Sequence, residues 1–343
     1  MQDLMQSTRP RVEHYLNNHP DGIIFLGNTA WKVQALAQGE YNLNYLIRSA
    51  SGSYVFRVNI GTQIGREDQI SYEYNALKLL EHSNVTPVPF FVDDSRRFFD
   101  TGILIMEYLP GEHLSYRHDL KAAARLFATL HQFEIACEHN HLIPEDAPFS
   151  QIYDECSGLL EVYFTSDLAV PDIREYLREV IDWADQHRSE ESYFQQDSWH
   201  CITNTEVNSG NFIVNRQEGT VHLVDWEMPR WGDPSQDLSH FCSPLTTLWK
   251  TSYRMTGRDK QRFLREYKTR LTDNHLRDTL EDRIQLRDPF VYLRGISWSA
   301  MGWVAYQTAF NGIKNPHTWK TLQQYMDLSF IKSLFDPFLY RRG

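Results

Sequence analysis

Four polar side chains of types that can bind a metal ion gather around one short hairpin predicted in the second half of the sequence. Asn211 stands at the start of one predicted strand, 211–214, and Asp225 directly follows the other, 220–224. Because the strands of a hairpin are antiparallel, these two ends lie side by side. An amide oxygen and a carboxylate are hard ligands, which Mg²⁺ takes together with water and phosphate oxygens.

Two further carboxylates lie close to this hairpin in the sequence. Glu227 is two positions beyond Asp225 and could add a ligand, and Glu206 lies five positions before Asn211 on the connecting loop. An ordinary polar loop, rich in turn-forming Asn, Ser and Gly, is the alternative interpretation. The spacing alone leaves both interpretations open.

The first third of the chain is predicted to be rich in β-strands. The predicted strands are 31–37, 44–49, 54–58, 88–92 and 102–108. Short turns join the first three of them, which predicts an antiparallel meander. Apolar residues from Ile70 to Leu80 recur at helical spacing, so a helix is predicted at 67–81.

The sequence is mainly helical after Pro110 and Gly111, which break the chain. The predicted helices are 119–133, 173–187, 258–273, 290–309 and 318–338. Asp288 and Pro289 fit the N-cap and the first residue of the helix at 290–309. The predicted class is therefore α+β, with a small β-rich lobe at 1–109, a connection at about 106–111 and a larger helical lobe at 110–343.

The composition excludes several classes of protein. The chain has 343 residues, 41% of them hydrophobic, and a formal net charge of −11, so a basic nucleic-acid-binding surface is not expected. It has no apolar run of 18 residues and no apolar leader at its start, which predicts neither a membrane span nor a secretory signal. The scattered cysteines favour reduced thiols in a cytoplasmic protein over a zinc site or a disulfide framework. They are Cys137, Cys156, Cys201 and Cys242.

Three motifs carry a resemblance to a known family. They are N-T-E-V-N-S-G-N at 204–211, V-D-W-E at 224–227 and G-D-P-S-Q-D-L at 232–238. They resemble the H-G-D-x-x-P-x-N, I-D-x-E and G-D-P-x-x-D-L motifs of the aminoglycoside phosphotransferase and choline kinase family, in the same order and at similar distances. The resemblance implies a two-lobe, protein-kinase-like fold that transfers the γ-phosphoryl group of ATP to a hydroxyl of a small molecule. It also implies that Asn211 and Asp225 hold Mg²⁺, with Glu227 as a further candidate ligand.

The resemblance extends upstream and covers about residues 30 to 245. The segment 103–111 reads I-L-I-M-E-Y-L-P-G and is similar to the family's hinge. Its backbone near Glu107 and Leu109 would therefore hold the adenine. By the same resemblance, the loop from Gly39 to Asn42 would cover the phosphates.

Arg57 stands where the family has a lysine that contacts the phosphates of ATP. Arginine keeps the positive charge and can donate two hydrogen bonds to a phosphate. Its acidic partner is predicted to be Glu73, which lies between Ile70 and Leu77 at helical spacing and so faces the lobe interior. A glutamate at the margin of the apolar face is the alternative.

Glu206 stands where the family has its catalytic aspartate, and Asn204 replaces the histidine two positions earlier. A glutamate can act as the base for the acceptor hydroxyl, but its side chain is one methylene longer. The prediction is an active phosphotransferase. The alternatives are a pseudokinase that binds the nucleotide without transferring phosphate, and a structural remnant that binds no nucleotide.

The segment 134–197 contains sixteen acidic and three basic residues, a net charge of −13. In the family, this part of the large lobe contributes to the cleft for the acceptor. A concentrated negative field would attract a cationic acceptor, such as an aminoglycoside, a choline-like amine or a polyamine. Solvated helix faces are the alternative interpretation.

The remaining conspicuous residues have structural interpretations. His131 is predicted to be buried and hydrogen-bonded, and Trp298 and Trp303 to pack in the core. Asp233 is predicted to cap a helix. Asp237 is predicted to brace the loop at Glu206 through hydrogen bonds, which the resemblance also implies.

Overall fold

The computed structural model describes residues 2–18, 23–27, 31–136, 140–308 and 316–340. The chain forms two compact units and passes between them more than once. The first, here the sheet unit, comprises Met1–Leu114, Phe133–Leu142 and Asn211–Pro229. The second, here the helical unit, comprises Ser115–Gln132, Ile143–Gly210 and Arg230–Gly343. The division of the sequence at residues 109 and 110 stays a prediction.

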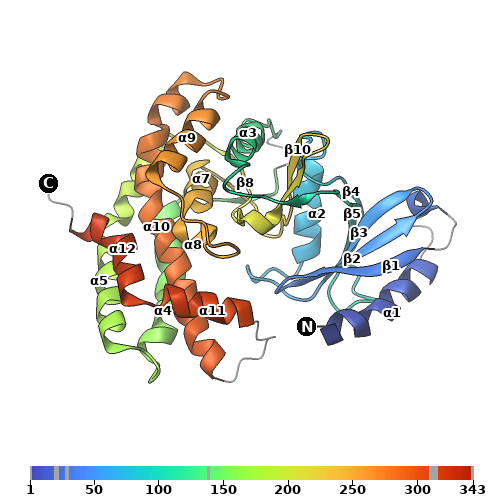
Figure 1. Cartoon of the computed structure of the whole chain (residues 1–343), viewed down its shortest axis with the longest axis horizontal. Helices are drawn as coiled ribbons and strands as arrows, with labels where there is room; N and C mark the ends of the chain where they lie inside the picture. The colour runs from blue at the N-terminus through green and yellow to red at the C-terminus, as the bar shows by residue number, and fades with distance from the viewer. Residues whose placement is uncertain (1, 19–22, 28–30, 137–139, 309–315, 341–343) are drawn as a thin grey trace. The chain divides into compact units, whose positions relative to one another are not determined.

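The sheet unit is built on a five-stranded antiparallel sheet in the order β1-β2-β3-β5-β4 (Figure 1). The strands are β1 (Lys32–Gln38), β2 (Asn42–Ser49), β3 (Gly52–Asn59), β4 (Pro89–Asp93) and β5 (Ile103–Glu107). The predicted meander is confirmed, because β1 pairs with β2 and β2 with β3. Tyr45 and Phe56 are opposite one another in β2 and β3 and are fully buried, as is Ile105 in β5.

Two helices flank this sheet. Helix α2 (Gln69–Leu79) forms within the range predicted from the sequence. Helix α1 (Gln2–Asn18), which lies along the sheet in Figure 1, was not predicted. It is polar on most of its surface, contains Pro10, and buries a narrow face that includes Val12 and Tyr15. The Tyr15 hydroxyl donates to the Asp93 carboxylate at 2.6 Å, which ties the helix to β4.

The predicted hairpin is also part of the sheet unit. Strands β9 (Phe212–Asn215) and β10 (Thr220–Leu223) pair in antiparallel fashion, and the short strand β6 (Glu112–His113) pairs with β9. The amide of Leu223 donates to the carbonyl of Val85 at 2.8 Å. The hairpin is thus fixed by backbone hydrogen bonds on both of its strands.

Gly111 is required for the close approach of its segment to the hairpin. A Cβ atom at this position would lie 2.7 Å from the carbonyl oxygen of Val214 and 2.8 Å from the Ile213 side chain. We expect Gly111→Ala to lower the free energy of unfolding by about 1–3 kcal/mol, because backbone must move to admit the methyl group. Gly158→Ala is the control, since this helical position has open space and the change should raise stability by up to about 1 kcal/mol. Urea denaturation of both variants checks this, and equal stabilities would contradict the assigned packing.

The helical unit contains most of the helices and a small sheet in the order β7-β11-β8. Its elements are α3 (Leu120–His131), β7 (Ile143–Pro144), α4 (Pro148–Phe164), α5 (Pro171–His187), α6 (Ser192–Gln196), β8 (Cys201–Thr203), β11 (Arg230–Gly232), α7 (Ser235–Cys242), α8 (Pro244–Thr247), α9 (Gly257–Lys268), α10 (Asn274–Gln307), α11 (Pro316–Tyr325) and α12 (Leu328–Leu339). Its core is formed by apolar residues of α4, α5, α10 and α12, among them Leu160, Leu177, Ile296 and Ile331. Trp303 packs against this core and stacks on Trp319.

No helix in the described ranges is long and apolar enough to cross a membrane.

The late helices differ from their predicted limits. The helix predicted at 290–309 begins at Asn274, where the Asp273 side chain accepts the amide of Leu276, so Asp288 and Pro289 lie inside α10 instead of starting it. Two buried arginines, Arg283 and Arg287, anchor the turns before Pro289, and this tertiary bonding offsets the hydrogen bond that a proline removes. Residue 309 lies outside the described residues.

The helix predicted at 318–338 is two helices. Asp327 accepts the amide of Phe330 and so starts α12 after a break. The helix predicted at 258–273 ends earlier, at Lys268. Helix α4 was not predicted, although Pro148 at its start is a typical first residue.

Candidate active site

A buried ion cluster joins β3, α2 and the end of the hairpin within the sheet unit. The Arg57 guanidinium donates through Nη1 to Glu73 at 2.5 Å and to Asp225 at 2.9 Å. Its Nε donates to Asn44 on the neighbouring strand at 3.0 Å. Arg57 and Glu73 are almost fully buried, whereas the Asp225 side chain is 30% exposed. The ion pair that the sequence analysis expected between Arg57 and Glu73 is therefore formed.

The carboxylates of this cluster maintain the charge of Arg57, whereas burial raises the pKa of Glu73. Burial acts to lower the pKa of Arg57, but the carboxylates of Glu73, Asp225 and Glu227 raise it above its ordinary value. Within the described part of the chain, Nη2 of Arg57 has no hydrogen-bond partner. A permanently charged guanidinium with one nitrogen available for hydrogen bonding can donate to a phosphate oxygen.

Asp225 adopts a backbone conformation that is unusual for a non-glycine residue, with φ of 66°. Such strain persists only where the surroundings impose it, and it is common at functional sites. The amide of Val224 donates to the carbonyl of Asn211 at 2.8 Å, which sets the two ends of the hairpin beside one another. The partly exposed carboxylate of Asp225 is thus close in the fold to the start of the first strand.

The donor set at the hairpin fits Mg²⁺. Asp225 and Asn211 offer hard oxygen atoms, and Mg²⁺ keeps several waters and takes phosphate oxygens alongside one or two protein ligands. No group of three or more His, Cys, Asp or Glu side chains within the described residues could hold a metal ion. Among the described residues, a metal site made of three or more such side chains is therefore not indicated. The assignment of Asn211, Asp225 and Glu227 as ligands stays a prediction.

The segment after Asp225 is held by side chains of α2 and β2. Gln69 donates to the carbonyl of Glu227 at 2.6 Å, and the Tyr72 hydroxyl donates to the carbonyl of Pro229 at 2.6 Å. Asn42 donates to the Glu227 carboxylate at 2.6 Å. Glu227 is 8% exposed and Asn42 is 4% exposed. These bonds keep the strained Asp225 in place, and they give Asn42 a structural contact besides its predicted place near the phosphates.

The remaining residues expected to contact ATP lie at or beyond the ends of strands of the same sheet. The amide of Gly39 donates to the carbonyl of Asn42 at 2.9 Å, which closes the turn between β1 and β2. Glu107 ends β5, and its amide donates to the carbonyl of Val88 at 2.8 Å. Leu109 follows it outside the strand and is partly buried. Their roles toward phosphate and adenine stay predictions.

Removal of the positive charge at Arg57 is expected to weaken MgATP binding more than replacement of the guanidinium by the ammonium group of lysine. Arg57→Ala should raise the dissociation constant strongly, and Arg57→Lys less, because charge matters before the forked geometry at a phosphate. Glu73→Gln should act in the same direction but more mildly. Titration calorimetry measures the affinities, and unfolding curves control for the loss of a buried partner, about 3–5 kcal/mol. Equal affinity of wild type and Arg57→Ala for MgATP would remove Arg57 from the nucleotide site.

The loop at Glu206 belongs to the helical unit and follows β8. Asp237 at the start of α7 accepts the amide of Asn204 at 2.8 Å and that of Thr205 at 2.9 Å. Thr205 has φ of 67°, which is a rare value for a β-branched residue. The Asn204 side chain accepts the amide of Glu206 at 2.9 Å. The predicted bracing of this loop by Asp237 is confirmed, and it holds the backbone directly before Glu206 in a strained conformation.

Two neighbours of this loop have structural roles, and that of His131 is the predicted one. His131 is buried, with one ring nitrogen 3.0 Å from the Tyr267 hydroxyl and the other 3.4 Å from Asp237. Asp233 lies one residue before Pro234, the N-cap of α7, so the predicted capping position is off by one, and its carboxylate accepts the amide of Ser235 at 2.9 Å. Its other carboxylate oxygen pairs with Arg283 of α10 at 2.5 Å.

The structure also shows an arginine of α10, Arg294, that was not singled out from the sequence. Its Nε donates to the Glu155 carboxylate of α4 at 3.1 and 3.2 Å. Burial acts to lower the pKa of Arg294, but the charges of Glu155 and Glu206 raise it above its ordinary value. A single arginine in the apolar stretch of α10 was the signal available in the sequence. Its contacts could not be foreseen, because α4 was not predicted.

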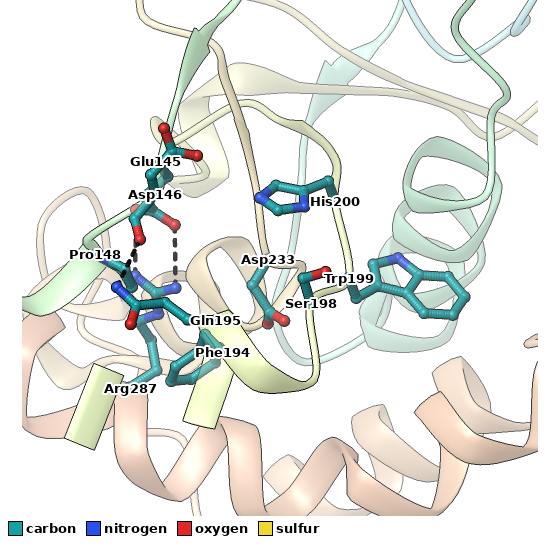
Figure 2. A pocket seen from close by; sticks show the side chains of 10 residues that line it. All are labelled: Glu145, Asp146, Pro148, Phe194, Gln195, Ser198, Trp199, His200, Asp233 and Arg287. Atoms are coloured by element: carbon teal, nitrogen blue, oxygen red, sulfur yellow. Dashed lines mark hydrogen bonds and ion pairs between the residues drawn. The ribbon is translucent and has the colours of Figure 1, made fainter. Parts of the chain in front are cut away.

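A pocket of about 240 Å³ lies elsewhere in the helical unit (Figure 2). Ser198, Trp199 and His200, which precede β8, form part of its lining. Arg287 in its wall is fully buried and bound to both carboxylate oxygens of Glu145. None of the side chains predicted to act on ATP or an acceptor lines this pocket.

The antiparallel sheet with its ion cluster and the mainly helical unit with the Glu206 loop define a protein-kinase-like α+β fold. The model of the phosphotransferase enzyme family matches residues 32–285, and the chain belongs to this family. The predicted fold class and the family resemblance are thereby confirmed. No curated protein sequence matches the chain.

Solved structures of similar fold agree with this assignment. Ethanolamine kinase of Plasmodium vivax is 15% identical with a TM-score of 0.62, over 93% of this chain and 88% of that one. Spectinomycin phosphotransferase in complex with ADP and spectinomycin is 12% identical with a TM-score of 0.59, over 89% and 92%. Choline kinase of Cryptosporidium parvum is 12% identical with a TM-score of 0.53, over 98% and 97%. At these identities the likeness is one of fold.

Proposed function

We propose that this protein transfers the γ-phosphoryl group of MgATP to a hydroxyl group of a small molecule. The observation that carries the proposal is the buried cluster of Arg57, Glu73 and Asp225 at the end of the hairpin. A buried arginine that keeps its charge, with its Nη2 not hydrogen-bonded within the described part of the chain, is better suited to binding a phosphate than to a purely structural role. Membership of the phosphotransferase enzyme family supports the same reaction.

Each part of the nucleotide has a proposed contact in the sheet unit. Arg57, held by Glu73, binds phosphate oxygens, and the turn at Gly39 and Asn42 covers them. Asn211 and Asp225 hold Mg²⁺, with Glu227 as a third candidate. When bound, the metal neutralises charge on the phosphate oxygens.

Two further contacts complete the proposed nucleotide site. Backbone groups near Glu107 and Leu109 bind the adenine. The ADP in the structure of spectinomycin phosphotransferase supports nucleotide binding by this fold.

Glu206 is proposed as the base for the acceptor. The acceptor oxygen forms a bond to the γ-phosphorus, the bond from that phosphorus to the β,γ-bridging oxygen breaks, and ADP leaves. Glu206 takes the proton of the acceptor hydroxyl. The bonds from Asp237 to the backbone of Asn204 and Thr205 fix the loop that aims this carboxylate.

The acceptor is proposed to carry a positive charge, and the protein to act in the cytoplasm. The segment 134–197, with its net charge of −13, supplies an attractive field for a cation. Ethanolamine and choline, named in two of the similar structures, are small cationic alcohols. The alternative of a pseudokinase gains no support from these relatives, which are named as phosphotransferases or kinases.

An ADP-release assay with a panel of hydroxylated acceptors tests the proposal. The wild-type protein should produce ADP from MgATP rapidly when a suitable acceptor is present, and no more than slowly in its absence. A thermal-shift titration with MgATP in parallel separates the alternatives. Stabilisation by MgATP without acceptor-dependent ADP across the panel would favour the pseudokinase, and the absence of both would favour the structural remnant.

A further inference from the structure

The sheet face that carries Arg57 makes a second contact with the segment that follows the hairpin. Arg57 and Asn59 share one face of β3, because side chains two positions apart in a strand point the same way. Asn42 of β2 is directly opposite Asn59 and so lies on that face too. Arg57 donates to Asp225, and Asn42 donates to Glu227, two positions further along the chain. The strands are therefore bonded to this segment at two points.

Three buried side chains form the second of these points. Nδ2 of Asn59 donates to Oδ1 of Asn42 at 3.1 Å, which orients the Asn42 amide so that its nitrogen faces Glu227. That nitrogen donates to Oε2 of Glu227 at 2.6 Å. A hydrogen bond to a carboxylate is stronger than one between neutral groups, and burial strengthens it further.

Asn42 also forms the base of the turn between β1 and β2. Its backbone carbonyl accepts the amide of Gly39 at 2.9 Å, and the carbonyl of Tyr41 accepts the amide of Ile60 at 2.7 Å. Gly39 and Glu40, at the tip of the turn, are exposed. The turn is thus held at its base, and the side chain of Asn42 links that base to Glu227.

We propose that Asn42 is a positioning residue, whose bond to Glu227 holds the β1–β2 turn where it covers the phosphates of the nucleotide. This inference rests on the nucleotide site of the proposed function. Both the oxygen and the nitrogen of the Asn42 amide are bonded to protein partners, which favours positioning over direct contact with phosphate. Asn42 then acts through Glu227, and the turn and the segment at Asp225 form one phosphate-binding unit.

A double-mutant cycle between Asn42 and Glu227 tests the inference by calorimetric titration with MgATP. Asn42→Ala and Glu227→Ala should each raise the dissociation constant about tenfold, because each removes the same bond to a charged group. Since both act through one bond, the double variant should also lose about tenfold. Losses that multiply to about a hundredfold, or no loss in Asn42→Ala, would overturn the inference.

A conservative variant separates the hydrogen bond from the charge of Glu227. Glu227→Gln keeps a side-chain oxygen that can accept from Asn42, so it should lose less affinity than Glu227→Ala. Equal losses in these two variants would assign the effect to the charge and overturn the inference.

Adenosine and a surface variant serve as controls. Adenosine has no phosphates, so its affinity should stay at the wild-type value in every variant, and a parallel fall for adenosine and MgATP would overturn the inference. Asn17→Ala removes an exposed asparagine side chain of α1 that donates to the carbonyl of Glu13. It should leave the dissociation constant of MgATP unchanged.

The variants are expected to fold. In Asn42→Ala, Asn59 keeps its bonds to the carbonyls of Tyr41 and Gly61, at 3.3 and 2.7 Å. The double variant removes both partners of the broken bond and should melt near the temperature of wild type. If Asn42→Ala alone does not fold, the double variant decides. A loss equal to that of Glu227→Ala supports the inference, and a larger loss overturns it.

Failure of this inference can be told apart from failure of the proposed function, because the cycle measures binding. Coupled losses in a protein that transfers no phosphoryl group would support the inference while the proposed function fails. Multiplied losses in a protein that transfers phosphate would overturn the inference and leave the proposed function standing. A wild-type protein that binds no MgATP would overturn both.

Discussion

Replacement of Glu206 by glutamine should lower phosphoryl transfer by about 10²–10⁴-fold while the affinity for MgATP stays nearly intact. The amide keeps the size of the side chain but cannot accept the proton of the acceptor hydroxyl. The proposed nucleotide contacts are made by residues of the sheet unit, which this change does not touch. The rate of phosphoryl transfer at saturating acceptor tests the expected loss of activity. Calorimetric titration with MgATP tests the expected unchanged affinity.

Glu206→Asp is the matched variant for this prediction. In an enzyme whose loop is adapted to glutamate, the shorter carboxylate falls back from the hydroxyl by about 1 Å, which can cost on the order of a hundredfold in rate. Asp237 and Asn204 fix the backbone of the loop, so it cannot easily follow the shortened side chain. In a pseudokinase, this variant would instead gain weak transfer. Wild-type turnover that is untouched by Glu206→Gln would remove Glu206 from the mechanism.

Loss of the Asp225 carboxylate should abolish the part of the thermal stabilisation by ATP that depends on magnesium. A ligand present at a hundred times its dissociation constant stabilises the folded state by about 2.7 kcal/mol, so the effect is large enough to measure. Asp225→Ala and Asp225→Asn should both lose it, because neither supplies an anionic oxygen.

The two Asp225 variants control for the strained backbone at this position. Asparagine tolerates a φ of 66° better than alanine does, so Asp225→Asn should fold with less loss of stability. Differential scanning fluorimetry with ATP, in magnesium and in EDTA, separates the metal effect from the folding effect. A magnesium-dependent shift of wild-type size in Asp225→Asn would show that the end of the hairpin is not the metal site.

Local patterns in the sequence were sufficient for the five-stranded sheet and the hairpin of the sheet unit, but not for its helix α1. Strand alternation and short turns are properties of neighbouring residues, and so the meander and the hairpin were predicted close to their observed limits. The pairing of Arg57 with Glu73 was also predictable, because helical spacing put the glutamate on the apolar face, where a carboxylate needs a cation.

Features that depend on distant contacts were not predictable in this way. Helix α10 continues through Pro289 because Arg283 and Arg287 bind acidic residues from other segments. The left-handed conformation of Thr205 is against the preference of its residue type and is accompanied by the bonds from Asp237. The ion pair of Arg294 with Glu155 required the packing of α4 on α10, of which only one helix was foreseen, with wrong limits.

The most direct test of the account is to follow the γ-phosphate of ATP by ³¹P NMR in the presence of magnesium and an acceptor from the panel. Wild-type protein should convert the γ-phosphate signal into that of a phosphomonoester of the acceptor, in step with the appearance of ADP, and Glu206→Gln should not. Binding of MgATP without any phosphomonoester, for every acceptor offered, would contradict the claim that this chain is a phosphotransferase.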